Sequence, residues 1–153
     1  MTGLSIRRVR FASPEAQRLV AEALAELAVR YDAESGDDTP IGPEDFEPPR
    51  GAFLLAYVEG RTVGCGGWRS HGEDAEIKRM YVVPAARGNG VGRAVLRALE
   101  ESAREYGRVR MILETGLGNP EAIALYQRHG YRRIPDYGYY RGYPDVRSFA
   151  RDL

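Results

Sequence analysis

The chain has 153 residues, a length typical of one domain that can bury a core without metals or disulfides. Its 22 basic and 22 acidic side chains cancel, so the totals give no electrostatic footprint for nucleic-acid binding. The longest apolar run, "AFLLAYV", is too short to span a bilayer, and the first residues contain no apolar stretch of signal-peptide length. We therefore expect a cytoplasmic protein without a membrane or nucleic-acid partner. The single cysteine, Cys65, excludes a disulfide framework and agrees with a reducing compartment.

The first third of the chain predicts a strand, a helix and a loop. A strand-like segment covers residues 4–9, and Ser13 followed by Pro14 is typical of a helix start. Apolar residues then recur at helical spacing as far as Tyr31. Residues 34–49 hold six carboxylates and no basic side chain, and they predict an acidic loop with at most one helical turn.

The remainder predicts strands that alternate with hairpins and helices. Glu59-Gly60 indicates a tight hairpin between two strands, and Gly107 and Gly130 are typical helix ends. The expected strands cover residues 51–58, 61–69, 74–83, 108–115, 131–134 and 145–153, and the expected helices begin near residues 90 and 119. This order predicts a fold of the α/β class with a mixed (α+β) sheet covered by helices, without an internal repeat or domain boundary.

Three glycines stand at every second position of "RGNGVGRAVL", between a strand that ends before Pro84 and a helix. Each glycine costs stability there, so a function for a bare backbone is expected. A helix start offers unpaired N–H groups and the positive end of the helix dipole, which together bind phosphate. Arg87 adds a planar cation suited to the same anion.

The spacing of the motif distinguishes between the possible phosphate-containing ligands. A mononucleotide P-loop requires Lys and Ser or Thr where Arg93, Ala94 and Val95 stand, so a nucleoside triphosphate is excluded. A dinucleotide loop requires a third glycine at the position of Arg93, although Glu114 at the end of the next strand mimics the ribose-binding acid. A dinucleotide-dependent oxidoreductase is therefore a weakened alternative.

The loop and its flanks resemble the GNAT superfamily of acetyl-CoA-dependent N-acetyltransferases. The run Arg87-Gly88-Asn89-Gly90-Val91-Gly92, after a strand ending "RMYVVP", is similar to the pyrophosphate loop of that family. "NPEAIALYQRHGYRRI" is similar to its second motif, and "AEIKRMYV" to its central strand. The resemblance covers roughly residues 52–134, and the first fifty residues fit more loosely. It implies a single N-acetyltransferase domain over residues 1–153 with the GNAT-like acyl-CoA N-acyltransferase fold.

The resemblance also implies how acetyl-CoA, the cosubstrate, would be held. The central strand would pair with the pantetheine arm through its backbone, and the cap of the following helix would reach the same arm. The residues implied in cofactor binding are Met80, Tyr81 and Val82 of the strand, the amides of Arg87, Gly88, Asn89, Gly90, Val91 and Gly92 with Arg93 at the edge, and Asn119.

The chemistry requires a proton acceptor and a proton donor. An alkyl amine with a pKa of about 10 is almost fully protonated at pH 7, and removing that proton accounts for about 4 kcal/mol of barrier. The resemblance assigns the base to Glu76, acting through a water, and the acid to Tyr126, which would protonate the departing thiolate. The structural alternatives are a strand carboxylate paired with Lys78 or Arg79, and a tyrosine of the core.

Other residues carry less chemistry. Cys65 lies in a glycine-flanked strand without a nearby base, so we expect a buried small side chain and not an acyl-enzyme nucleophile. His71 and His129 have no spaced acids around them, and no metal site is expected. Gly64, Gly66 and Gly67 indicate a close neighbour, either a ligand or a packed helix.

The sequence leaves the identity of the amine acceptor open. The acidic loop and the tyrosines between residues 137 and 143 lie where the family builds its acceptor pocket, and carboxylates with aromatic faces suit a cationic amine. A small molecule and a peptide amine are both compatible, as are a monomer and a homodimer. The expected reaction is direct attack of a primary amine on acetyl-CoA in a ternary complex. A non-catalytic acyl-CoA-binding sensor is the main alternative.

Overall fold

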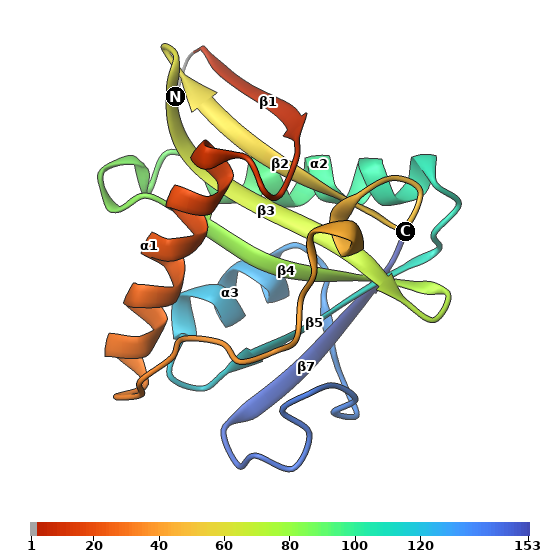
Figure 1. Ribbon diagram of the computed structural model, residues 1–153. Coiled ribbons are helices and arrows are strands. Elements are labelled where there is room, and N and C mark those ends of the chain that lie inside the picture. Colours follow the sequence, from red (N-terminus) through yellow and green to blue (C-terminus); the bar gives the residue numbers. More distant parts are fainter. Residues whose placement is uncertain (1–2) are drawn as a thin grey trace.

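In the computed structural model, which describes residues 3–153, all strands belong to one seven-stranded sheet (Figure 1). The strand order is β1-β2-β3-β4-β5-β7-β6. The strands are β1 (Leu4–Val9), β2 (Gly51–Val58), β3 (Arg61–His71), β4 (Asp74–Val82), β5 (Arg110–Gly116), β6 (Arg132–Ile134) and β7 (Val146–Asp152). The helices are α1 (Pro14–Arg30), α2 (Val91–Glu105) and α3 (Pro120–Arg128), with short 3-10 turns η1 (Pro43–Phe46) and η2 (Pro84–Ala86). The predicted mixed sheet flanked by helices is confirmed.

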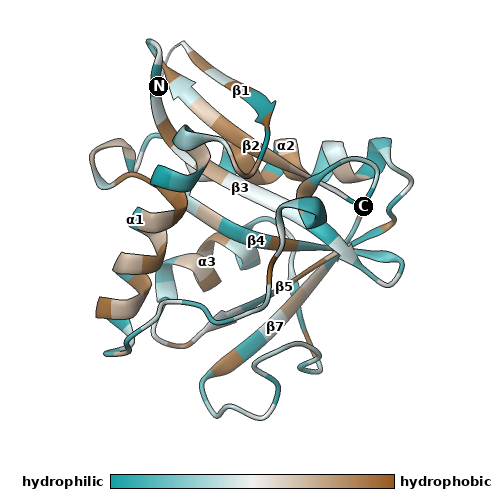
Figure 2. Cartoon of the chain, in the orientation of Figure 1, coloured by the Kyte–Doolittle hydropathy of each residue, from teal (hydrophilic) through white to brown (hydrophobic). Residues whose placement is uncertain are grey.

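The helices cover the sheet on both faces. On one face α1 and η1 enclose a cluster that includes Leu19, Phe46 and Phe53. On the other face α2 and α3 cover a larger cluster around Trp68 and Leu99. Figure 1 shows α1 and α2 on opposite sides of the central strands, and Figure 2 shows β2 as apolar along most of its length between them. Apolar burial on two faces explains why β2 reads as a continuous apolar run.

Local capping explains where the helices begin. Ser13 accepts a hydrogen bond from the backbone N–H of Ala16 at 3.3 Å, and Asn119 accepts one from Ala122 at 3.3 Å. Gly107 follows α2 with φ of +77°, the left-handed conformation that a helix end favours. The predicted caps are confirmed, whereas α3 is shorter than the predicted three turns, with nine residues.

The glycines of β3 make room for protein and not for a ligand. An ideal Cβ at Gly64 would lie 3.0 Å from Val91 of α2, and one at Gly67 would lie 2.6 Å from the ring of Phe46. A Cβ at Gly66 would also approach α2 closely, at 3.1 Å from Leu99. The close neighbour that these glycines indicate is therefore packed protein on both faces of the strand. In residues 3–153, no helix is long and apolar enough to cross a membrane.

One strand pair divides the sheet. All neighbouring strands are antiparallel except β4 and β5, which are parallel and pair only through Ala75 with Met111 and Glu76 with Ile112. Beyond Glu76 the two strands separate, so within the described part of the chain residues 77–82 have no strand partner on the side of β5. Backbone groups that face an opening in a sheet are available to an extended ligand.

Candidate active site

A β-bulge in β4 shapes the edge of this opening. Lys78 pairs with Gly67 and Tyr81 pairs with Cys65, so two residues of β4 stand opposite one residue of β3. The bulge places Arg79 at φ of +58°, which is uncommon for a residue with a side chain. The thiol of Cys65 donates to the carbonyl oxygen of Arg79 at 3.3 Å. The bulge therefore turns the backbone of β4 at the mouth of the split.

Cys65 contributes to this geometry as a structural residue. It is fully buried, and burial raises the pKa of its thiol to about 12. A thiol that stays protonated is a poor nucleophile. The expectation of a buried small side chain is confirmed.

The glycine loop follows β4 and η2 and leads directly into α2. Gly88 and Gly90 have φ of +79° and +82°, which explains the choice of glycine at both positions. The amide of Asn89 donates to the carbonyl oxygens of Ala86 and Arg87 at 3.2 and 3.1 Å, and so fixes the turn. No side chain caps α2 at Gly90, so the N–H groups of its first turn remain available to an anion.

Gly92 lacks a packing explanation. It lies in the first turn of α2, where glycine costs about 1 kcal/mol relative to alanine. The nearest atoms to an ideal Cβ are 3.6 Å away on Leu125 and 3.7 Å away on Val82, which is ordinary contact distance. A bare backbone at this position fits a ligand that approaches the start of the helix closely.

The side chain of Arg87 points from the loop toward α1. Its Nε donates to the carbonyl oxygen of Val82 at 3.0 Å, and its Nη2 lies 2.7 Å from Glu26. The guanidinium also lies over the ring of Tyr81, 5.7 Å from its centroid. The predicted phosphate-binding arginine therefore has a carboxylate partner, while Arg93 is exposed on α2.

A cavity of about 460 Å³ fills the split and continues under the acidic loop. It extends from α3 and the bulge to the tyrosine-rich loop, residues 135–145, which joins β6 to β7. Among the predicted residues, Met80, Tyr81, Asn119 and Tyr126 line it, whereas Glu76, Val82 and residues 87–93 of the glycine loop do not. One cavity thus connects the predicted donor and acceptor sides.

Tyr126 stands in the wall of this cavity. Its hydroxyl lies 3.7 Å from Sδ of Met80, and its ring packs edge-on against Tyr131 with centroids 5.6 Å apart. Burial raises the pKa of the Tyr126 hydroxyl above its ordinary value of 10. The group therefore keeps its proton at neutral pH and can donate it.

Glu76 is held inside the sheet at the vertex of the split. It is 1% exposed, and its Oε1 accepts a hydrogen bond from Nε of Arg69 at 2.9 Å. Its Oε2 accepts one from the hydroxyl of Tyr137 at 2.5 Å. The expected alternative partners, Lys78 and Arg79, contact a different carboxylate.

That carboxylate is Asp37 of the acidic loop. It forms ion pairs with Lys78, at 3.4 Å, and with Arg79, and it accepts hydrogen bonds from Thr39 N–H and from the Tyr140 hydroxyl, each at 3.0 Å. Burial opposes ionisation of Asp37, but Lys78, Arg79 and the hydrogen bonds outweigh it and hold its pKa at about 2, against an ordinary 3.8. Asp37 therefore fastens the acidic loop over the split.

Glu114, which mimics a ribose-binding acid in the sequence, is a carboxylate of the cavity wall in the structure. It lines the cavity from β5, two residues beyond the last pairing with β4. Its Oε2 accepts from the N–H of Tyr140 at 3.3 Å, and its Oε1 is buried without a hydrogen-bond partner in residues 3–153. Burial raises the pKa of Glu114, and Lys78 offsets part of the effect. The sequence feature that could have indicated Glu114 as a site residue is a carboxylate directly after the apolar run "MIL".

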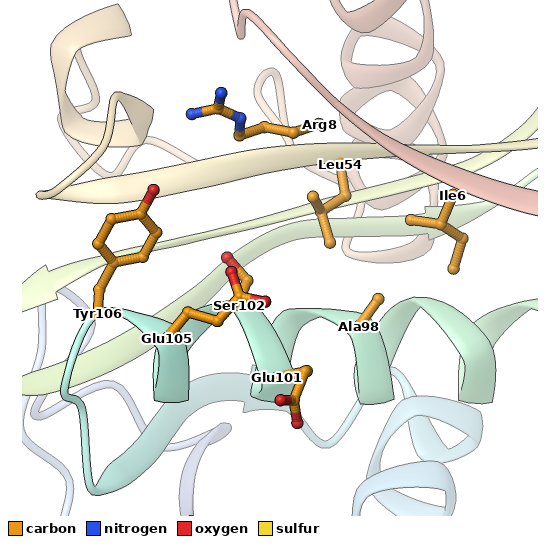
Figure 3. A pocket seen from close by; sticks show the side chains of 8 residues that line it. All are labelled: Ile6, Arg8, Leu54, Ala98, Glu101, Ser102, Glu105 and Tyr106. Carbon is orange, nitrogen blue, oxygen red and sulfur yellow. The ribbon is translucent and has the colours of Figure 1, made fainter.

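A second cavity, of about 420 Å³, lies between β1, β2 and α2, away from the split. Figure 3 shows Ile6 and Leu54 pointing toward α2, while Glu101 points away from the sheet. Ser102 in this lining accepts a hydrogen bond from Trp68 and is a packing contact. Within residues 3–153, no three His, Cys, Asp or Glu side chains are grouped to hold a metal ion.

Comparison with known proteins assigns this architecture to a class. The model of the acetyltransferase (GNAT) family matches residues 16–131, and the chain belongs to that family. It is therefore an acyltransferase, and the predicted resemblance is confirmed.

Individual relatives extend the similarity over most of the chain. The chain is 35% identical over 125 residues to an IAA acetyltransferase of Azospirillum brasilense, covering 80% of each protein. It is 33% identical over 129 residues to an uncharacterized N-acetyltransferase of Escherichia coli (strain K12), covering 80% of this chain and 77% of the relative.

Solved structures agree with the fold. The crystal structure of a putative acyl-CoA N-acyltransferase from Klebsiella pneumoniae superimposes with a TM-score of 0.81 at 28% identity, over 98% of this chain and 97% of that one. A GNAT acetyltransferase from Elizabethkingia anophelis, solved with acetyl-CoA bound, superimposes over the full length of both chains with a TM-score of 0.73 at 18% identity.

Proposed function

We propose that this protein transfers an acetyl group from acetyl-CoA to a primary amine of a small-molecule or peptide acceptor, by direct attack in a ternary complex. The observation that carries the proposal is the single cavity, which joins the split between β4 and β5 to the space under the acidic loop. Two substrates can meet there without a covalent enzyme intermediate. The buried, protonated thiol of Cys65 agrees with this route.

The donor would occupy the glycine loop and the split. The free N–H groups at the start of α2 and the unexplained bare backbone at Gly92 suit a pyrophosphate. The edge of β4 at Met80, Tyr81 and Val82 has no strand partner on the side of β5 and suits an extended pantetheine arm, although Arg87 occupies the carbonyl oxygen of Val82. Asn119 lines the same cavity. The acetyl-CoA bound to the Elizabethkingia protein supports the same donor here.

The amine attacks the thioester carbonyl, the C–S bond breaks and a thiolate leaves. We assign proton donation to the thiolate to Tyr126, which is the protonated hydroxyl in the cavity wall. Its hydroxyl lies beside Met80 at the bulge, in the part of β4 that no longer pairs with β5.

We assign the amine's proton to Glu76, through a water, as the sequence predicts. Both carboxylate oxygens of Glu76 accept hydrogen bonds, from Arg69 and Tyr137, which fix the orientation of the carboxylate. Glu114 is the competing acceptor because it lines the cavity and has an unpartnered oxygen. The two assignments differ in which Glu→Gln variant loses activity.

Thiol release tests the function directly. Protein, acetyl-CoA and a panel of amines, amino acids and peptides are incubated, and free thiol and acetylated product are both measured. Initial rates varied in both substrates should give intersecting lines, and Cys65→Ala should remain active. Tight binding of acetyl-CoA without thiol release for any acceptor would replace the enzyme with a binding module.

A further inference from the structure

An exposed ion pair connects α1 to the glycine loop. Nη2 of Arg87 lies 2.7 Å from Oε1 and 2.9 Å from Oε2 of Glu26. The two side chains are 42% and 33% exposed, so a ligand from solution can reach both. In the described part of the chain, Nη1 of Arg87 makes no hydrogen bond, which leaves one edge of the guanidinium free.

The two partners come from the glycine loop and from α1, the helix that leads into the acidic loop. Arg87 is the first residue of the glycine loop, where the pyrophosphate is proposed to bind. Glu26 lines the cavity that extends under the acidic loop. A change at the donor end can therefore reach the acceptor end through α1.

The same end of α1 has a second attachment. Nη1 of Arg30 lies 3.0 Å from Oε2 of Glu121 and 3.0 Å from the carbonyl oxygen of Gly118, at the start of α3. The last turns of α1 are thus tied to both sides of the split, and the acidic loop follows directly after them. Releasing one attachment would loosen both the end of the helix and the loop.

We propose that Glu26 competes with the pyrophosphate of CoA for Arg87, so that donor binding frees the end of α1. A phosphate oxygen is a strong partner for a guanidinium, and a carboxylate beside the phosphates is repelled by them. Donor binding then leaves Glu26 without its cation in the wall of the acceptor cavity. The inference rests on the proposed function, since it takes the glycine loop as the donor site.

The inference predicts opposite effects from the two partners on CoA affinity. Glu26→Gln removes the competitor and should tighten CoA binding about threefold to fivefold, the range expected for a partly exposed pair. Arg87→Gln should weaken CoA binding, and adding Glu26→Gln to it should then tighten binding less than Glu26→Gln does in the unaltered protein. Glu22→Gln, one turn earlier on α1 with Arg18 as its partner, is the matched control and should leave CoA affinity unchanged.

Calorimetric titration with CoA measures these affinities, and hydrogen exchange measures the release of α1. In the unaltered protein, CoA should accelerate exchange of the amides at residues 27–31, whereas in Glu26→Gln these amides should exchange fast with or without CoA. Unchanged or weaker CoA binding by Glu26→Gln, or increased protection of α1 by CoA, overturns the inference. Failure of the unaltered protein to bind CoA would instead overturn the proposed function.

Discussion

Replacing Tyr126 by phenylalanine separates catalysis from folding. The substitution removes only the hydroxyl, whose one polar contact within residues 3–153 is Sδ of Met80 at 3.7 Å. A thioether is a weak acceptor, so no strong buried partner loses its hydrogen bond. The free energy of unfolding should therefore change by less than about 0.5 kcal/mol.

The effect on the rate should be much larger. If Tyr126 donates to the developing thiolate, Tyr126→Phe removes one preorganised, buried donor from the wall of the cavity. Loss of one such donor costs about 100-fold in kcat, or about 2.7 kcal/mol of transition-state stabilisation. The KM for acetyl-CoA should change little because the hydroxyl acts on the leaving group. Because the pKa of Tyr126 is raised above 10, this group should not reduce the rate of the unaltered enzyme as the pH rises to 10.

Tyr131 provides the matched control. The ring of Tyr131 packs against the ring of Tyr126, but the hydroxyl of Tyr131 donates to Oε2 of the buried Glu100 at 2.7 Å. Tyr131→Phe should cost about 1.5–3 kcal/mol of stability, since a buried carboxylate loses a partner, and should leave kcat nearly unchanged.

Thiol-release kinetics and thermal unfolding on both variants give the comparison. Refutation would be a Tyr126→Phe enzyme with unaltered kcat, or two variants that lose activity in proportion to lost stability. In the second case Tyr126 is a packing residue.

Three further changes test other parts of the site. Glu76→Gln should lower kcat/KM about 100-fold at pH 7, and the activity of this variant should recover toward pH 10, where the amine loses its proton unaided. If Glu114→Gln shows this profile and Glu76→Gln remains active, Glu114 is the base. Gly92→Ala should weaken CoA binding at least tenfold in titrations while raising the melting temperature, since alanine is the better helix former by about 1 kcal/mol; equal affinity would show that no ligand approaches this backbone. The pKa of Asp37 is lowered to about 2, so its ionised form adds about 2 kcal/mol of stability above pH 4 that is lost as the pH falls toward 2. Asp37→Asn should abolish this part of the acid dependence in denaturant titrations, whereas Asn at the exposed Asp38 should preserve it.

The elements of the fold could be predicted because their signals are local. Ser13 with Pro14, and Asn119 with Pro120, mark helix starts through contacts within three or four residues. Gly90 has a positive φ that belongs to the loop itself. Such features do not depend on which strands become neighbours, and the structure confirms them.

Local signals could not predict which side chains of β4 face α1 and which face α2. With strict alternation, Met80 would lie on the α1 face together with Lys78. The bulge at Arg79 shifts the alternation, so that Tyr81 packs on the α1 side, and Met80 and Val82 on the α2 side. Arginine rarely adopts a positive φ, so the sequence does not indicate the bulge. Only the pairing of β4 with β3 reveals it. The contact between Met80 and Tyr126 depends on it.

The place where β4 and β5 separate has the largest consequence for the chemistry. Glu76 occupies the last paired position, at the vertex, and Glu114 lies two residues further along β5 in the open part. Glu114 lines the cavity and Glu76 does not, so we expect that only a small amine reaches Glu76 through a water, and that a bulky peptide amine meets Glu114 first. The size of the acceptor and the identity of the base are therefore linked, and the preferred amine from the thiol-release panel should indicate which Glu→Gln variant loses more activity.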